Sequence, residues 1–336
     1  MKTFYTIAEV GQAHDGSLGI LHSFIDAAAE CGVNAIKFQT HIAEAESSEF
    51  EPFRVNFSYE DKTRYDYWKR MEFTQEQWIE IGKHCHVAGL DFISSPFSLM
   101  AVDVLEKSGV DKYKLGSGEV SNLTLIRKIC ETKKPIIISS GLSDLEELKE
   151  TVAFIQHYGN DLSILQCTTA YPTQPEEWGL NQIKNIKEAF PENTIGFSDH
   201  SGDIFACISA ANWGAEIFEF HITFDHLMFG PDRLASLTIN QVKNLVNGLN
   251  QTARALNSPI LTRLTEEKKS LKNIFGKSLA VNKNLPEGHI ITFQDLETKK
   301  PAGKGIDAKL FGEVINKPLK RKLSKWDFLT WDDLKG

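Results

Sequence analysis

The chain has 336 residues, of which 41% are hydrophobic and 24% charged, and its formal net charge is −8. This composition is ordinary for a soluble globular protein, with room for one large domain and a small one. The acidic balance and the absence of a basic run argue against nucleic acid and membrane surfaces as partners. No apolar run approaches the roughly 18 residues of a membrane span, and the N-terminus lacks a signal-peptide core, so we expect a cytoplasmic protein.

The cysteines give no sign of a disulfide framework. Their number is odd, and none forms a CxxC pair that would suggest a zinc site. We therefore expect small, buried, free thiols in a reducing compartment at Cys31, Cys85, Cys130, Cys167 and Cys207.

Residues 1–257 alternate short β-rich runs with longer segments of helical period. The runs are almost continuously apolar, which is typical of strands covered on both faces. Eight strands are predicted, over residues 4–11, 34–39, 91–97, 112–118, 135–141, 162–171, 194–200 and 216–223.

The intervening segments carry helix signals. Apolar side chains at helical spacing follow the first run and end at Gly32, where a C′ glycine would stand. Capping boxes are expected at Ser143 with Glu146 and at Thr238 with Gln241. Eight βα units in roughly 250 residues predict a closed (β/α)8 TIM barrel. An open doubly wound sheet is the alternative, but it usually has fewer strands and a GxGxxG fingerprint, which we do not find.

Two segments fall outside this alternation. Residues 40–74 form a long polar and aromatic insertion, which is either a functional lid or binding loop or a solvated excursion. Residues 258–276 are expected to be a linker, and residues 277–336 a small, mostly β domain with little core of its own.

Two predicted strands each end in a histidine, His200 and His221. The C-terminal ends of parallel strands meet at one edge, where α/β folds place their sites. A lone histidine is more often structural, but this matched pair, with Asp199 and Glu219 close by, favours a divalent metal site.

Lys37 and Lys114 lie inside predicted strands on either side of the third strand. A buried ammonium group is unfavourable unless it meets an anion. With strand-end hydroxyls and glycine amides, the two lysines would form a phosphate cradle. Pairing with a local glutamate such as Glu119 is one alternative. A Schiff-base lysine is another, but it would not explain the histidine pair.

The strand-end motifs, in chain order, resemble those of the sialic acid synthase family: EVGQAHDGSL, KFQTH, SSPFS, YKLGSGE, IISSGLS, QCTTAYPT, GFSDHS and EFHITFD. The tail SLAVNKNLPEGHIITFQDLETKKPAGKGI is similar to the family's antifreeze-like (SAF) domain. The resemblance covers essentially the whole chain. It implies a transferase on a TIM barrel followed by a SAF domain, which condenses phosphoenolpyruvate (PEP) with N-acetylmannosamine or a related 2-acetamido sugar and releases phosphate. It also implies Mn²⁺, or Mg²⁺ or Co²⁺, and a domain-swapped homodimer.

The resemblance also implies roles for individual residues. The carboxylates implied in catalysis are Glu9, Glu119, Glu219 and Asp232. The residues implied in PEP binding are Lys37, Ser95, Lys114, Ser117, Ser139 and Ser198. Sugar binding is implied for Gln39, Thr169, Tyr171 and Lys300, and metal ligation for His200 and His221.

The chain departs from the family pattern at three positions, Ala13, Thr169 and Lys300. The last stands where well-known members have an arginine that contacts the sugar's acyl group. Lysine lacks the planar guanidinium fork, so the identity of the sugar stays open.

Two other functions are compatible with a barrel of this kind. One is another PEP-dependent synthase that makes a 3-deoxy-sugar acid, and the SAF-like tail argues against it. The other is a non-catalytic sugar-binding protein on the same barrel. Retention of both lysines, both histidines and the acidic positions argues against that interpretation.

Overall fold

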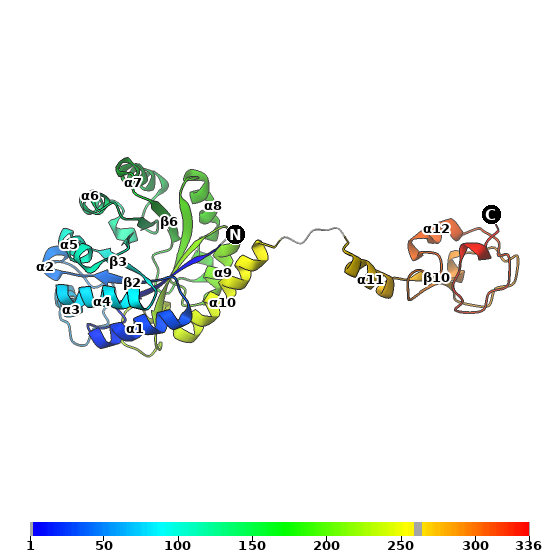
Figure 1. The fold of residues 1–336 in the computed structure, drawn as a ribbon, viewed down its shortest axis with the longest axis horizontal. Helices are drawn as coiled ribbons and strands as arrows, with labels where there is room; N and C mark the ends of the chain where they lie inside the picture. Colours follow the sequence, from blue (N-terminus) through cyan, green and yellow to red (C-terminus); the bar gives the residue numbers. More distant parts are fainter. Residues whose placement is uncertain (1–2, 259–263, 336) are drawn as a thin grey trace. The chain divides into compact units, whose positions relative to one another are not determined.

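The computed structural model describes residues 3–258 and 264–335. The chain divides into two compact units, Met1–Pro259 and Ile260–Gly336. In the larger unit, helices surround a central set of strands (Figure 1).

Within the described part of the larger unit, eight parallel strands close into a barrel. Each strand pairs with the next in chain order, and β1 also pairs with β8. This closure confirms the predicted TIM barrel and excludes the open sheet. The strands are β1 (Tyr5–Gly11), β2 (Ala35–Thr40), β3 (Asp91–Pro96), β4 (Lys112–Leu115), β5 (Ile136–Ser139), β6 (Leu162–Cys167), β7 (Thr194–Asp199) and β8 (Ile217–Thr223), with a short β9 (Leu237–Thr238) beside β8.

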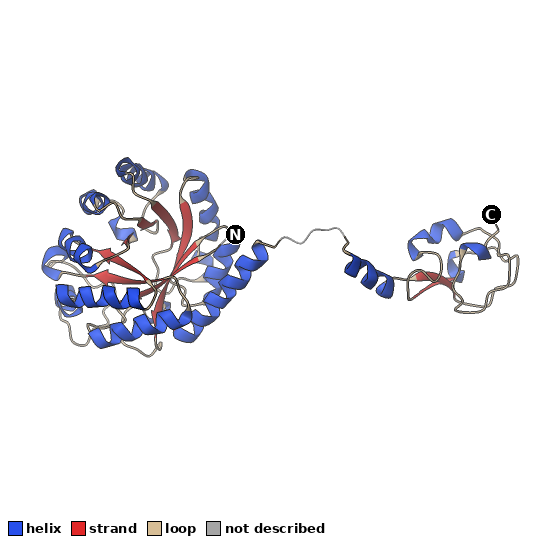
Figure 2. Cartoon of the chain, in the orientation of Figure 1, coloured by secondary structure: helices blue, strands red, loops and turns tan. Residues whose placement is uncertain are grey.

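Helices cover the outside of the barrel (Figure 2). Their buried faces pack with outward-facing strand residues in one apolar cluster, which includes Phe24, Phe92 and Phe218. No helix among residues 3–258 and 264–335 is both long and apolar enough to span a bilayer. The covering helices are α1 (Leu18–Cys31), α4 (Gln75–Val87), α5 (Leu99–Ser108), α6 (Leu123–Glu131), α7 (Leu145–Tyr158), α8 (Leu180–Ala189), α9 (Ile204–Asn212) and α10 (Ile239–Leu256).

Helix ends follow the sequence signals with one exception. Gly32 ends α1 in the left-handed region at φ 74°, and the capping box of Thr238 with Gln241 begins α10. The predicted cap of α7 at Ser143 was wrong. The side chain of Asp144 accepts the free amides there, because a carboxylate caps as well as a hydroxyl and stands one residue nearer the helix.

Side chains that point into the barrel follow the two-residue period of the strands. One interior layer is apolar and consists of Ile7, Ala35, Ile93, Ile137, Leu165 and Ile217. Two residues further along the same strands the side chains are mostly polar or charged: Glu9, Lys37, Ser95, Ser139 and Glu219, together with Cys167. An apolar plug therefore supports a polar layer toward the C-terminal ends of the strands.

Gly196 gives a test of how tightly this plug is packed. A Cβ atom at this position would lie 2.4 Å from Leu165 Cδ2 and 2.5 Å from the carbonyl oxygen of Ile217. We expect Gly196→Ala to lower the free energy of unfolding by about 1–3 kcal/mol through overpacking, measured as a lower thermal midpoint by circular dichroism. The control is Gly19→Ala on α1, where the nearest atom is 4.0 Å away. Equal midpoints for the two variants would contradict the tight packing.

The insertion between β2 and α4 is a packed part of the barrel unit. It contains α2 (Ala43–Glu46) and α3 (Arg64–Met71). A small cluster anchors it, with Tyr67, Trp68 and Met71 buried. Arg70 pairs with Asp15 at 2.6 Å and with Asp61 at 2.9 Å. The insertion therefore has a small buried cluster of its own, while Phe50 and Tyr59 are exposed.

The smaller unit begins with α11 (Glu266–Phe275), inside the range expected to be a linker, and none of the side chains of α11 is buried. Residues 259–263 of that range lie outside the described residues. The antiparallel pair β10 (Ser278–Val281) and β11 (Leu296–Lys299) and the short α12 (Phe311–Val314) follow. The expectation of little core was wrong, because this unit has a buried apolar cluster: Leu279, Val281, Leu285, Ile291, Ile306, Val314, Leu319, Leu323, Leu329 and Leu334.

An internal repeat accounts for that core. Residues 285–296 and 323–334 share the pattern L-x5-[IL]-T-x2-D-L. Leu285 and Leu323 exchange backbone hydrogen bonds of 2.8 and 2.9 Å, so the two copies pair. In each copy a threonine and a buried aspartate, Asp295 or Asp333, form a capping box. Much of this unit is turns and isolated bridges, with less regular strand than a mostly β domain would have.

Candidate active site

The polar layer of the barrel borders a cavity of about 180 Å³, here called the inner chamber. It brings together all six residues expected to bind PEP, namely Lys37, Ser95, Lys114, Ser117, Ser139 and Ser198. Seven other predicted site residues also line it: Glu9, Gln39, Thr169, Tyr171, His200, Glu219 and His221. Their roles stay predictions, but their placement around one cavity is a fact of the fold.

The ammonium groups of the two lysines converge on Glu219. Its Oε1 lies 3.8 Å from Nζ of Lys37 and 3.8 Å from Nζ of Lys114. Lys37 also pairs with Glu9 at 2.8 Å, and Lys114 donates to Ser139 Oγ at 2.7 Å. The lysines thus meet carboxylates of β1 and β8, which barrel closure brings beside them, and not the Glu119 that the local-pairing alternative named.

Burial and mutual pairing shift the pKa values of the two lysines and of Glu219. Burial opposes the charge of Lys37, but Glu219 and Glu9 outweigh burial and raise the pKa of this lysine. Burial lowers the pKa of Lys114, and the charge of Lys37 adds to this effect. Burial would raise the pKa of Glu219, yet Lys114 and Lys37 hold it below its ordinary value. A bound anion beside Lys114 would favour the charged form of that lysine.

Two further details shape the inner chamber. Oε2 of Glu219 is buried without a hydrogen-bond partner among the described residues, which marks a place for a water or a ligand. A Cβ on Gly141 would lie 2.5 Å from Thr169 Oγ1 and 2.7 Å from Ser117 Oγ. Glycine at this position therefore leaves room for two hydroxyl groups that face the cavity.

His200 and His221 lie together at the ends of β7 and β8, with ring centroids 5.3 Å apart. Nδ1 of His200 lies 2.9 Å from the carbonyl oxygen of Thr168, which leaves Nε2 of His200 free as a ligand atom. Burial lowers the pKa of His221 to about 3, so this imidazole is neutral. Burial opposes the charge of His200, but Cys167 and the Thr168 carbonyl outweigh burial and raise the pKa of His200. With His200 deprotonated, the pair would offer two nitrogen lone pairs to a cation.

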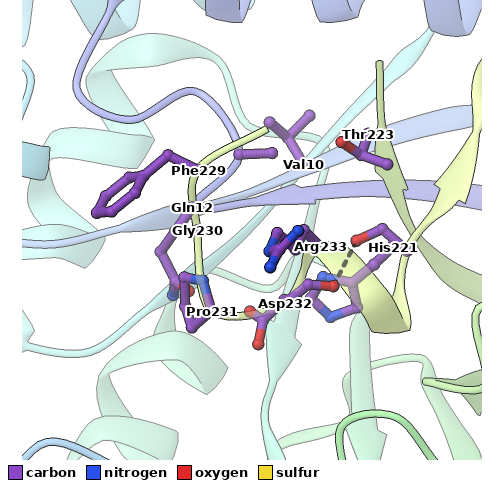
Figure 3. A pocket seen from close by; sticks show the side chains of 11 residues that line it. Val10, Gln12, His221, Thr223, Phe229, Gly230, Pro231, Asp232 and Arg233 are labelled. Carbon is purple, nitrogen blue, oxygen red and sulfur yellow. Dashed lines mark hydrogen bonds between the residues drawn. The ribbon is translucent and has the colours of Figure 1, made fainter. Parts of the chain in front are cut away.

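The surroundings add no third protein ligand that is already in position. In the part of the chain that the structure describes, no three His, Cys, Asp or Glu side chains gather around one metal position. A metal at the histidine pair would take its other ligands from water or substrate, as at an open catalytic site. Figure 3 shows His221, Gln12 and Asp232 around a small pocket next to this pair.

A second cavity of about 400 Å³, here called the outer chamber, adjoins the inner one. The two share Gln39, Phe97, Thr169, Tyr171 and His221. The remaining residues of the outer chamber are Gln12, His41, Glu46, Glu51, Arg54, Arg64, Trp68, Glu119 and Asp232. The predicted carboxylates Glu119 and Asp232 thus lie here and not in the inner chamber.

Much of the lining of the outer chamber comes from the insertion over residues 40–74. No individual residue of this insertion was predicted from the sequence as a site residue. The guanidinium of Arg54 stacks on Tyr171, 4.1 Å from the ring centroid, and pairs with Asp232 at 2.5 Å. The ring of His41 lies between Trp68 and Phe97, at centroid distances of 3.7 and 4.7 Å. The only available signal was the mixture of aromatic and charged residues over positions 40–74.

Lys300 belongs to the smaller unit, where its Nζ lies 5.2 Å from the ring centroid of Phe275.

Cys167 was expected only as a small buried residue, but it lines the inner chamber with Sγ 3.9 Å from His200 Nδ1. All five cysteines are free and buried, as expected.

Comparisons with known proteins agree with the fold and identify the family. The model of the NeuB family matches residues 24–260. The N,N′-diacetyllegionaminic acid synthase of Campylobacter jejuni subsp. jejuni serotype O:2 is 32% identical over 323 residues, which are 94% of this chain and 96% of that protein. N-acetylneuraminate-9-phosphate synthase of Homo sapiens is 32% identical over 316 residues, 93% of this chain and 88% of that protein.

A solved structure supports the same conclusion. The crystal structure of N-acetylneuraminic acid (sialic acid) synthetase from Leptospira borgpetersenii serovar Hardjo-bovis, in complex with citrate, matches with a TM-score of 0.71 and 27% identity. The match covers 80% of this chain and 90% of that one. These relatives are named acid synthases, which confirms the resemblance drawn from the strand-end motifs. The chain belongs to the NeuB family.

Proposed function

We propose that this protein is a nonulosonic acid synthase that condenses PEP with N-acetylmannosamine or a related 2-acetamido sugar. The observation that carries the proposal is the convergence of Lys37 and Lys114 on one buried chamber beside the pair His200 and His221. Membership of the NeuB family supports it. The proposed products are a 2-keto sugar acid and inorganic phosphate.

PEP would occupy the inner chamber. Its phosphate and carboxylate groups would accept charge-assisted hydrogen bonds from the two lysines and hydrogen bonds from the serine hydroxyls. The open-chain sugar would lie in the outer chamber, with its aldehyde toward the histidine pair. Gln39 and Tyr171 line both cavities and would contact both substrates.

His200 and His221 would hold Mn²⁺, or Mg²⁺ or Co²⁺. When bound, such an ion supplies Lewis-acid polarisation of the aldehyde oxygen. The methylene carbon of PEP forms a bond to the aldehyde carbon, and the aldehyde oxygen gains a proton. Water adds to the electron-poor enol carbon and loses one proton, which gives a tetrahedral carbon with a hydroxyl and the phosphate. The C–O bond to phosphate then breaks with its electron pair leaving on the phosphate, and the hydroxyl loses its proton to give the keto group. Glu9 and Glu119 are the proposed groups that accept the proton of the attacking water.

The direct test incubates the purified protein with PEP, Mn²⁺ and a panel of 2-acetamido sugars. We expect stoichiometric phosphate and 2-keto acid, with the mass of the condensed product, from at least one sugar. Simple aldose phosphates, the substrates of 3-deoxy-sugar acid synthases, are the control. Turnover with those alone would reject the proposal, and binding of a sugar without any turnover would indicate the sugar-binding alternative.

We further propose that residues 277–336 are a SAF domain that covers the barrel of a second chain in a homodimer. Large apolar side chains on loops of the barrel unit are exposed, namely Phe50, Tyr59, Leu142 and Leu227. The smaller unit exposes Phe275, Phe293, Phe311, Trp326 and Trp331. Exposed apolar groups of this size favour a protein interface.

A mixing experiment tests the covering of one chain by another. A chain ending at Asn257 should bind Mn²⁺ and lose most sugar turnover, because closure over the site is absent. Mixing it with a full-length chain inactivated by His221→Ala should restore activity, since the truncated barrel would receive an intact tail in trans. Native mass spectrometry confirms that heterodimers form. Heterodimers without activity would contradict the covering of one chain's barrel by the other chain.

A further inference from the structure

The outer chamber has more carboxylates than cationic groups. Relatives of this chain are named for both phosphorylated and unphosphorylated acid products, so family membership does not decide whether the sugar carries a phosphate. The charges around the chamber bear on this point. In its described lining the carboxylates are Glu46, Glu51, Glu119 and Asp232, and the guanidinium groups are Arg54 and Arg64.

Both arginines already have anionic partners. Arg54 pairs with Asp232 at 2.5 Å, and its face is covered by Tyr171. Arg64 Nε lies 3.5 Å from Glu51 Oε1. A phosphate could form a bidentate pair with either guanidinium only in competition with its carboxylate.

The pair of Arg64 and Glu51 is held in place by its surroundings. The guanidinium of Arg64 lies 3.9 Å from the ring centroid of Trp68. Nε1 of the same tryptophan donates to Glu51 at 3.1 and 3.2 Å. The side chain of Arg64 is only 14% exposed, so swinging it toward a new anion would break several of these interactions at once.

The cations that suit a phosphate lie in the other chamber. Lys37 and Lys114 line the inner chamber, where the proposed function places PEP. A dianionic phosphate in the outer chamber would instead approach the carboxylates of Glu46 and Glu119.

The other polar groups of the outer chamber suit hydroxyl and amide groups. Gln12 and Gln39 contact each other at 2.6 Å, and Thr169 adds a hydroxyl. Carboxylates accept hydrogen bonds from sugar hydroxyls and amide N–H groups. We infer that the outer chamber selects an uncharged 2-acetamido sugar over its phosphate monoester, and that the pairing of Arg64 with Glu51 is part of this selection. The inference rests on the proposed synthase function.

The test compares N-acetylmannosamine with N-acetylmannosamine 6-phosphate as co-substrates of PEP in the full-length, Mn²⁺-loaded protein. Formation of the 2-keto acid gives kcat/KM for each sugar. We expect kcat/KM for the uncharged sugar to be at least about tenfold higher, the factor that corresponds to one modest charge interaction. A higher value for the 6-phosphate would overturn the inference and leave the synthase function standing. No product from either sugar or from an uncharged 2,4-diacetamido hexose would refute the proposed function itself.

A charge variant tests the named pair. Glu51→Gln keeps an acceptor for Trp68 and releases Arg64 from its anion, so the kcat/KM of the 6-phosphate relative to the uncharged sugar should rise about tenfold. Glu49→Gln is the matched control, because Glu49 is exposed on the same insertion and does not line the outer chamber. An unchanged ratio in Glu51→Gln, or an equal rise in both variants, would overturn the role of the pair.

Discussion

Replacing Lys114 with methionine should weaken PEP binding by about 30- to 150-fold and leave sugar binding much less affected. The side chain of Lys114 is 3% exposed, and its ammonium lies between Glu219 and Ser139. Removing a charge-assisted hydrogen bond at such a buried position costs about 2–3 kcal/mol, which corresponds to that change in affinity. Titration calorimetry with PEP gives the dissociation constant directly. Methionine keeps most of the side-chain volume and so limits the cavity that alanine would leave.

The same strand supplies the control for this measurement. Lys112 lies two residues earlier in β4 and pairs with Asp91, away from the inner chamber. Lys112→Met removes the same charge and should leave the dissociation constant for PEP within about twofold, because its charge is partly exposed and screened. Equal weakening in both variants would show that net charge, and not the position of Lys114, governs PEP binding. Unchanged affinity in Lys114→Met would refute the phosphate cradle.

The second large effect concerns the metal. His221→Ala should lower the affinity for Mn²⁺ by about 100-fold or more, since the loss of an outer-shell partner alone costs about 10- to 100-fold at metal sites. It should also abolish metal-dependent turnover while the thermal midpoint changes little. Calorimetric titration of Mn²⁺ into the apoprotein measures the affinity without relying on activity. His200→Ala should behave in the same way, because the two imidazoles act on one ion.

An exposed histidine provides the comparison. His157 lies near the end of α7 on the surface, and His157→Ala should bind Mn²⁺ as the unaltered protein does. Full turnover of His221→Ala in the presence of a strong chelator would contradict the metal assignment. So would tight one-to-one Mn²⁺ binding retained by both His200→Ala and His221→Ala.

Local patterns in the sequence were sufficient for the barrel and for much of the site. The apolar strand runs and intervening helical segments specify βα units, and eight such units close into a ring. Because parallel strands place their C-terminal ends at one edge, reading the strand ends collected the lysines, serines and histidines that line the inner chamber. The positions of these residues could be predicted because they depend only on where each strand ends along the chain.

Tertiary structure alone decided the partners of these groups. Glu9 and Glu219 are far apart in sequence, yet pairing of β1 with β8 sets both beside Lys37. The outer chamber depends on how the insertion folds back, so Arg54, Glu51 and Trp68 left no periodic signal. The core of the smaller unit likewise arises from pairing between two copies of a repeat. The periodicity of apolar residues predicts whether a segment is a helix or a strand and which of its faces is buried. Charge pairing and packing between elements depend on how the folded chain brings distant segments together.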